Sequence, residues 1–187
     1  RIDVKSDLDA PALARQTVLV EDFVPERIDV RLDLADAPLV LGAATSVTAE
    51  ARYLFGAPGA DLAVEGDLRL MRRDTLADWP GYRFGRHDAA FSPRQAGLTG
   101  TRTDAAGIAT VPLAWPEIQA EGVLLQAALT VRVSDGAGRP VERTLTRPVA
   151  PAGPVVGIRP AFDDGLPEGA EARFDLIALG AAEPLSA

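Results

Sequence analysis

The sequence predicts an all-β protein built as an antiparallel β-sandwich. Apolar and polar residues alternate with a period of two in four separate runs, which is the pattern of strands with one buried face. The 17 glycines and 15 prolines, about 17% of the 187 residues against an average of roughly 12%, gather between these runs and favour many turns. No long window repeats with a period of 3.6, so helix should be scarce.

Each alternating run predicts a strand whose apolar side faces a shared core. The apolar sets are Ile28, Val30, Leu32 and Leu34; Val47, Ala49, Ala51, Tyr53 and Phe55; Leu62, Val64, Gly66, Leu68 and Leu70; and Val123, Leu125, Ala127, Leu129, Val131 and Val133. Residues 55–59 connect the second and third sets, and residues 134–140 form a Gly-rich hairpin loop after the fourth. The turn 104–107 precedes a further strand over 108–113. Strands at this spacing, separated by such turns, indicate a sandwich.

Residues 71–104 show no sustained alternation, which is a long interval for a compact domain. They hold four of the ten aromatic residues, Trp79, Tyr82, Phe84 and Phe91. Because a loop rich in aromatic side chains usually packs onto its own domain, we expect an ordered insertion near 72–103.

Two breaks in composition predict the domain boundaries. The Pro-rich segment 148–154 predicts a stiff, extended connector, and the segments 155–159 and 171–179 after it predict two strands. Two strands cannot close a sandwich. A strand over 15–20 precedes the first alternating run, and the start of the chain, without Met or a signal peptide, suggests a piece of a longer protein. We therefore predict terminal strands of a preceding domain over 1–22, a complete sandwich over 23–150, and opening strands of the next domain over 151–187.

Composition excludes several classes of function. The formal charge of −8 and the isoelectric point near 4.7 argue against a nucleic-acid partner, whose phosphates need clustered cations. The chain has no cysteine and one histidine, His87, and it carries no nucleotide-binding or zinc-protease motif. It has no apolar run long enough to span a membrane. We predict no catalytic, cofactor-binding or metal-binding residue, and hence no enzyme.

Two polar clusters can be interpreted either as functional sites or as ordinary surface residues. His87 precedes an aspartate, but a single histidine in a polar loop is more often a surface residue than a catalytic one. Asp163 and Asp164, with Glu168 nearby, suggest a Ca²⁺ site at a domain joint. The alternating spacing of Ca²⁺ ligands is missing there, so an acidic turn is favoured.

For the other residues considered, a structural role is a sufficient explanation. Glu65 and Asp67 share one strand face and invite comparison with a glycosidase pair, but a solvated sheet face explains them. The Arg72–Arg73 pair is expected to be solvated, with a partner contact as the alternative. The aromatic residues Tyr53, Phe55 and Trp115 are expected in the core or at a domain joint.

Several segments resemble the alpha-2-macroglobulin and complement family. Residues 20–30, VEDFVPERIDV, resemble the joint between consecutive macroglobulin-like domains, and residues 51–58, ARYLFGAP, resemble that family's A-R-Y-L-[FY]-G-x-P segment. Residues 104–109 resemble its D-x-x-G-x-A hairpin, and residues 157–169 the start of a following domain. The insertion over 82–94 is similar to bacterial members.

The resemblance implies a fibronectin III-like macroglobulin domain from a bacterial alpha-2-macroglobulin. Such proteins are periplasmic protease inhibitors, commonly inner-membrane lipoproteins, that trap a protease after cleavage of a bait segment, often through a Cys-Gln thioester. Here cysteine is absent and no glutamine (Gln16, Gln95, Gln119, Gln126) has a thioester context, so the resemblance implies a scaffold segment. Its implied partners are adjacent domains, and proteases through the full-length protein; a neighbouring cell-wall synthase is an association common among bacterial members. The alternatives are a fibronectin-like accessory or adhesion module of a secreted or surface protein and an isolated enzyme.

Overall fold

The computed structural model describes residues 2–7, 9–17, 27–86, 88, 91–118, 122–136, 139–163 and 165–180. These residues form strands and turns without helix, which confirms the all-β prediction, and so no described helix could cross a bilayer. The strands are β1 (Ile2–Lys5), β2 (Ala12–Gln16), β3 (Ile28–Asp33), β4 (Ser46–Tyr53), β5 (Ala63–Arg73), β6 (Arg83–Phe84), β7 (Arg94–Gly97), β8 (Thr101–Arg102), β9 (Ile108–Pro112), β10 (Leu124–Ser134), β11 (Val141–Val149), β12 (Val155–Pro160) and β13 (Phe174–Leu179).

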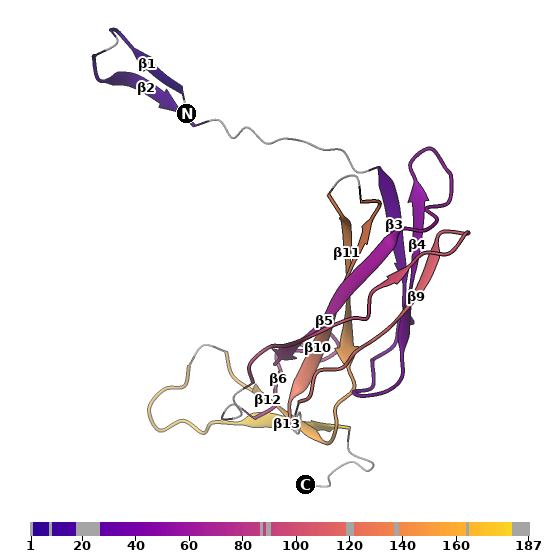
Figure 1. The fold of residues 1–187 in the computed structure, drawn as a ribbon. Helices are drawn as coiled ribbons and strands as arrows, with labels where there is room; N and C mark the ends of the chain where they lie inside the picture. Colours follow the sequence, from indigo (N-terminus) through magenta and orange to yellow (C-terminus); the bar gives the residue numbers. More distant parts are fainter. Residues whose placement is uncertain are drawn as a thin grey trace.

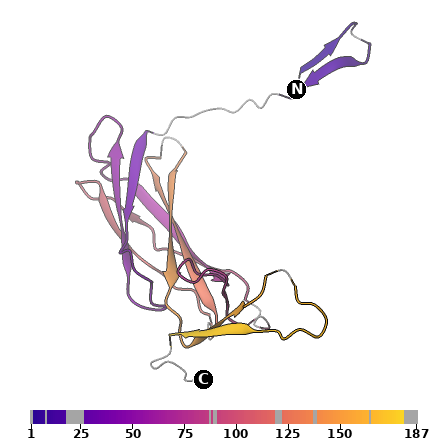
Figure 2. The same ribbon diagram turned by 180° about the vertical axis from the view of Figure 1, so that it is seen from behind.

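Two antiparallel sheets form the sandwich. One has the order β3-β4-β9, and the other has the order β11-β10-β5-β7 with β8 also paired to β5. Figures 1 and 2 show the two sheets as neighbouring layers that run along the same long axis. β10 and β5 are the longest strands and pair along their whole length, from Leu124 opposite Arg73 to Ser134 opposite Ala63. They therefore form the central pair of strands in the larger sheet.

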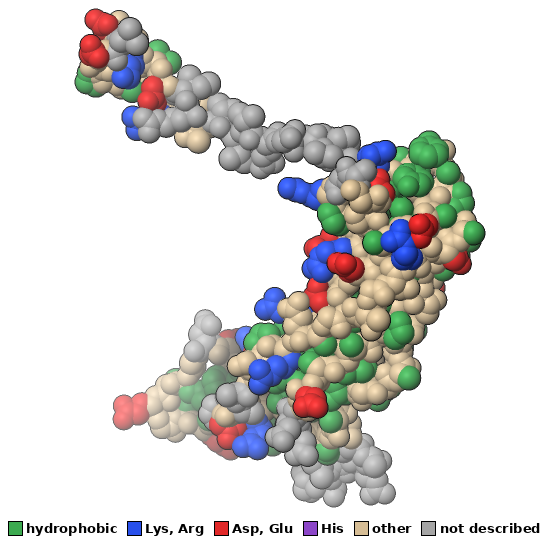
Figure 3. All heavy atoms as spheres, in the orientation of Figure 1, with side chains coloured by type: hydrophobic (Ala, Val, Ile, Leu, Met, Phe, Trp, Pro, Cys, Tyr) green, Lys and Arg blue, Asp and Glu red, His purple; other side chains and the backbone are tan. Residues whose placement is uncertain are grey.

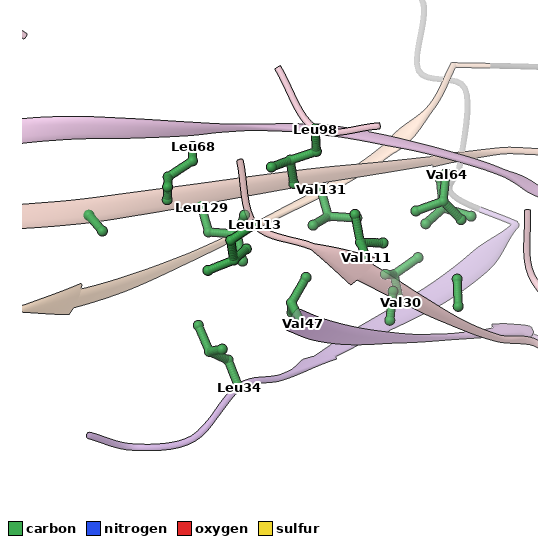
Figure 4. Close-up of a cluster of buried hydrophobic side chains, with 14 of the residues drawn as sticks. Val30, Leu34, Val47, Val64, Leu68, Leu98, Val111, Leu113, Leu129 and Val131 are labelled. Atoms are coloured by element: carbon green, nitrogen blue, oxygen red, sulfur yellow. The ribbon is translucent and has the colours of Figure 1, made fainter. Parts of the chain in front are cut away.

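The inward side chains of both sheets meet in one core. Val30, Val47 and Val111 from the smaller sheet point into the same space as Leu68, Leu129 and Val131 from the larger one (Figure 4). All six are nearly or completely buried, as the alternation predicts. Burial of this apolar surface, at roughly 25 cal/mol per Å², is the main stabilising contribution of such a core.

The alternation of the second run ends earlier than predicted. Phe55 is 81% exposed, so it does not lie in the core, and its alternative place at a domain joint stays a prediction. β4 ends at Tyr53, and the chain turns at Gly56, whose φ of 98° is in the left-handed region. Phe55 lies beyond the end of the strand, and its ring stacks on that of Tyr53 with the centroids 5.2 Å apart.

The turn at 104–107 sets the register of β9. The Asp104 carboxylate accepts hydrogen bonds from the amides of Ala106 and Ile108, both at 2.9 Å. Gly107 has φ +83°, and a Cβ there would lie 2.4 Å from the carbonyl oxygen of Ala51. Because the Ala51 amide donates to the Gly107 carbonyl at 2.8 Å, the turn packs directly against β4.

The 72–103 region, expected to be an ordered insertion, contains three short strands. β5 runs on to Arg73, β7 and β8 pair with β5, and β6 pairs elsewhere. Strands of two to four residues cannot show a readable alternation. The end of the insertion is fixed by Thr103, which is buried and donates its hydroxyl to the Gly59 carbonyl at 2.6 Å.

Two strand pairs lie outside the sandwich sheets. β1 and β2 pair with each other, and β2 ends at Gln16, so the predicted strand over 15–20 is displaced, with 18–20 outside the described residues. After the connector, β12 pairs with β13, as predicted for two strands there. The boundaries 1–22, 23–150 and 151–187 stay predictions.

The fixed register of β3 leads to the first testable prediction. Val30 is 3% exposed and Arg31 is exposed, so the substitution Val30→Asp should reduce the free energy of unfolding by at least about 3 kcal/mol, the cost of an unpaired buried charge. The matched substitution Arg31→Gln should change it by less than about 1 kcal/mol, since it removes only a surface contact to Asp29. Urea denaturation of both variants measures the difference; equal losses would contradict the assigned faces.

Candidate functional site

Within the described residues, the strand β6 links the insertion of the sandwich to the strands that follow the connector. This two-residue strand belongs to the insertion of the sandwich but pairs with β12 beyond the connector, with Phe84 opposite Gly157 and Arg83 opposite Ile158. The resulting sheet has the order β13-β12-β6. Figures 1 and 2 show β12 and β13 lying across the end of the sandwich beside β6. We call the contact of β6 and its neighbours with β12 and β13 the joint.

The joint has its own small hydrophobic core. Phe84 is 1% exposed and packs with Leu124 and Val155, which are also buried. Leu76, Tyr82, Ile177 and Leu179 surround them and are partly buried. The residues come from the insertion, from the start of β10 and from the two strands after the connector. The joint therefore ties three parts of the chain together by apolar burial.

Gly157 provides the space for the Phe84 ring. A Cβ built at Gly157 would lie 2.4 Å from Cε1 and 2.7 Å from Cδ1 of Phe84. Real Cβ atoms do not approach so closely, and here the obstacle is a rigid ring that is itself buried. The backbone of Gly157 is extended, so the glycine is needed for room rather than for its dihedral angles.

Backbone hydrogen bonds hold β6 on both sides. The Phe84 amide donates to the Asp74 carbonyl at 2.8 Å, within the insertion. The Gly85 amide donates to the Val156 carbonyl at 3.0 Å, across the joint. Gly85 has φ +83°, which turns the chain out of β6 and directs the next amide, that of Arg86, to the Gly122 carbonyl at 3.4 Å. The amides of Phe84 and Gly85 thus attach the short strand to the insertion on one side and to β12 on the other.

Aromatic and charged side chains form the rim of the joint. The Arg159 guanidinium lies 4.7 Å from the centroid of the Tyr82 ring, in a cation–π geometry, and donates to the Asp175 carboxylate at 2.6 Å. The Asp175 hydrogen bond, and then the tyrosine, raise the pKa of Arg159. Trp79 contacts the Tyr82 ring edge-on at 6.1 Å. Arg159 and Asp175 belong to β12 and β13, whereas both aromatic rings belong to the insertion.

The connector is also held against the sandwich. The Leu39 amide donates to the Pro148 carbonyl at 2.9 Å, and the Ala150 amide donates to the Leu39 carbonyl at 2.7 Å. Arg147 donates to the Leu34 carbonyl at 2.9 Å. The chain therefore leaves β11 in a fixed direction and enters β12 after only a few residues.

The polar residues considered in the sequence do not assemble into a described site. His87 and Asp164 lie outside the described residues, and Asp163 and Glu168 are exposed. Within the described ranges, no group of three His, Asp or Glu side chains could hold a metal ion. The statement that the chain has no catalytic, cofactor or metal residue stays a prediction.

The other residues that the sequence analysis considered as functional make hydrogen bonds or packing contacts within the fold. Asp67 accepts a hydrogen bond from Arg132 at 2.8 Å, and Arg132 also donates to Glu142, whereas Glu65 is exposed. Arg72 donates to the Arg86 carbonyl at 2.6 Å, close to the joint. The indole of Trp115 is partly buried against the core and donates to the Ala43 carbonyl at 2.9 Å. Charged side chains of both signs are interspersed on the face of the sandwich that Figure 3 shows.

The pairing of β6 with β12 is the contact that the sequence analysis missed. The sequence shows Gly157 inside a predicted strand, and it shows Phe84 followed by Gly85. A glycine inside a strand often marks a close approach of another group. That signal points to Gly157 but not to its partner. The fold and the joint together define an antiparallel β-sandwich module with a further strand pair attached through β6.

Comparisons with known proteins identify the module. The family described as the bacterial alpha-2-macroglobulin MG5 domain matches residues 26–151. The alpha-2-macroglobulin of Xylella fastidiosa is 34% identical over 186 residues, which cover 96% of this chain and 11% of that protein. The chain belongs to the bacterial alpha-2-macroglobulin family, of which it contains a macroglobulin-like domain, and it spans about a tenth of the length of that relative.

Solved structures show the same fold. The native conformation of Escherichia coli alpha-2-macroglobulin, determined by electron cryomicroscopy, matches with a TM-score of 0.69 and 25% identity, over 94% of this chain and 12% of that one. The trypsin-activated form of Escherichia coli alpha-2-macroglobulin matches with a TM-score of 0.67 and 28% identity, over 85% of this chain and 12% of that one. Both resemble this chain across most of its length.

The close packing at the joint gives the second prediction. Gly157→Ala should lower the free energy of unfolding by about 1–3 kcal/mol, because the added methyl group displaces the Phe84 ring or β12. Gly165→Ala is the matched control, since a Cβ there meets nothing within 4 Å, and it should stay within about 0.5 kcal/mol. Hydrogen exchange localises the effect. The Gly85 amide, bonded to Val156, should exchange faster in Gly157→Ala, whereas amides in β4 should not; an unchanged Gly85 rate would contradict the role of the joint.

Proposed function

We propose that this chain is a scaffold segment of a protease-trapping bacterial alpha-2-macroglobulin, and that its joint makes the sandwich and the following strands move together. The observation that carries the proposal is the continuous sheet β13-β12-β6, in which a strand of one domain's insertion pairs with a strand beyond the connector. Moving the two parts independently would require breaking this pairing and exposing Phe84. Rigid elements of this kind are the means by which a local change becomes a domain movement.

The structural likenesses support the scaffold role. Native and trypsin-activated Escherichia coli alpha-2-macroglobulin resemble this chain with TM-scores of 0.69 and 0.67. A segment that matches both forms about equally well is suited to be carried as a unit while other parts rearrange. The membership of the family also disfavours the alternatives of a fibronectin-like accessory module and an isolated enzyme.

The whole protein's setting is part of the same proposal. The family resemblance implies a periplasmic protein, anchored as an inner-membrane lipoprotein, that defends the bacterium by trapping foreign proteases. Because this chain has no cysteine, any thioester of the full-length protein belongs to another segment. Adjacent domains are the direct partners of this segment, whereas proteases and a cell-wall synthase would be partners of the full-length protein.

The first test of the proposal uses the chain alone. Added in equimolar amount to trypsin, the 187-residue chain should leave hydrolysis of a large protein substrate unchanged, and a denaturing gel should show no covalent product. The reason is that trapping requires a bait, a reactive group and enclosure by several domains. Inhibition or an adduct would refute the assignment of this segment as scaffold.

The second test uses the full-length protein. Gly157→Ala, and separately a long Gly/Ser insertion within residues 151–154, should leave cleavage of the bait by trypsin unchanged but reduce the amount of trapped protease by at least about threefold. The loss follows from uncoupling the two parts of the chain at the joint. Gly165→Ala should trap as well as the unmodified protein. If both joint variants trap normally, the joint does not contribute to the movement.

A further inference from the structure

The basic residues of the chain lie almost entirely in strands. The chain has 19 arginine and lysine residues, and among the described ones only Arg27, Arg86, Arg139 and Arg173 lie outside a strand. Acidic residues are placed differently, because many of the 27 belong to turns and loops, as Glu168 does. This separation determines which peptide bonds a protease of a given specificity can reach.

The described loops between the strands carry no arginine or lysine over long stretches. Residues 34–45, 54–62, 74–82, 103–107 and 165–172 contain none. Exposed loops are the parts of a folded chain that proteases prefer to cut, because a protease binds its substrate as an extended segment. A protease whose specificity pocket requires a basic side chain therefore finds no residue to bind in these loops.

The arginines inside strands are protected by strand pairing. Arg69 of β5 and Arg132 of β10 each lie opposite a paired residue on both neighbouring strands. Such a strand must leave its sheet before a protease can bind it, so the rate of cleavage follows the small population of the opened form.

Three of the four arginines outside strands have a carbonyl group that the fold already uses. The carbonyls of Arg27 and Arg173 accept backbone hydrogen bonds at 3.1 and 2.9 Å. The Arg86 carbonyl accepts a hydrogen bond from the Arg72 guanidinium at 2.6 Å. Cleavage after an arginine requires that same carbonyl oxygen to enter the oxyanion hole of the protease, while the nucleophile attacks the carbonyl carbon. Each of these bonds must therefore leave its place in the fold before it can be cut.

Proline follows the fourth of these arginines. Arg139 is exposed in the hairpin before β11, and the next residue is Pro140. A proline after the arginine hinders cleavage, because its ring replaces the amide N–H and restricts the conformation of the residue before it. Arg147 and Arg159, which lie in strands, are also followed directly by proline.

We propose that the folded segment 27–174 resists proteases that cleave after arginine or lysine, and that the placement of its basic residues provides the resistance. Its loops stay open to proteases of another specificity, such as those that cleave after glutamate. The proposal goes beyond the scaffold role and does not depend on trapping, because the resistance belongs to this segment whether or not the full-length protein encloses a protease.

Limited proteolysis of the 187-residue chain tests the proposal, with the cut bonds identified by mass spectrometry. Trypsin should cut the bonds after Arg27 through Arg173 at least about a hundredfold more slowly than it cuts unfolded peptides that contain the same bonds. A glutamate-specific protease should cut after the exposed Glu168 within about tenfold of the rate for its peptide. Bonds after Lys5 and Arg15 are not scored, because β1 and β2 pair only with each other among the described strands. Rapid cutting by trypsin at any scored bond, or protection of the bond after Glu168, would overturn the proposal.

Two variants add a cleavable bond without changing the strands. Glu168→Arg places a basic side chain at an exposed loop position, and trypsin should then cut after position 168 at least about tenfold faster than after any native arginine between 27 and 173. Glu168→Gln is the matched control and should stay uncut there. Pro140→Ala removes the proline after Arg139 and should allow cleavage of that bond. Resistance of Glu168→Arg would overturn the proposal, and resistance of Pro140→Ala would refute the role assigned to the proline.

Discussion

The absence of a side chain at Gly157 is the condition on which the joint depends. The Phe84 ring occupies the volume that a Cβ would need, and this lets two backbones approach closely enough to pair. A two-residue strand has too few hydrogen bonds to persist by itself. Burial of the ring beside Leu124 and Val155 supplies the additional stabilisation. Arg159 and Tyr82 add a cation–π contact between β12 and the insertion at the rim.

The two cores of the described structure are linked through a single strand. Leu124 and Leu125 are consecutive residues of β10, both buried, yet Leu124 packs in the joint and Leu125 in the sandwich. Displacement of the joint therefore acts directly on a central strand of the larger sheet, without a flexible segment in between. The connector adds a second attachment, because residues 148–150 are bonded to Leu39. A module held at two separate places resists rotation better than one held by a linker.

The sequence predicts the sandwich well because its strands are long and each has one apolar face. The burial of Val30, Val47 and Val131 follows directly from alternation. The misassignment of Phe55 arises because a turn with positive φ breaks the alternation where the residue type alone continues it. The joint could not be predicted, since β6 has only two residues and its partner, β12, lies beyond the whole sandwich in the sequence. Pairing between distant short strands leaves no periodic signal.

The position of β6 in the chain has a consequence for synthesis on the ribosome. The sandwich core can close as soon as Val149 has emerged, since β3 to β11 are then all present. Phe84 lacks its cover at that stage, because Val155 and Gly157 are made later. The nascent chain thus passes through an interval in which a folded domain displays an exposed aromatic ring and an unpaired strand edge, the kind of surface that chaperones bind and that promotes aggregation. Completion of β12 ends this interval, so the sandwich reaches its protected state only when the strand beyond the connector has been made.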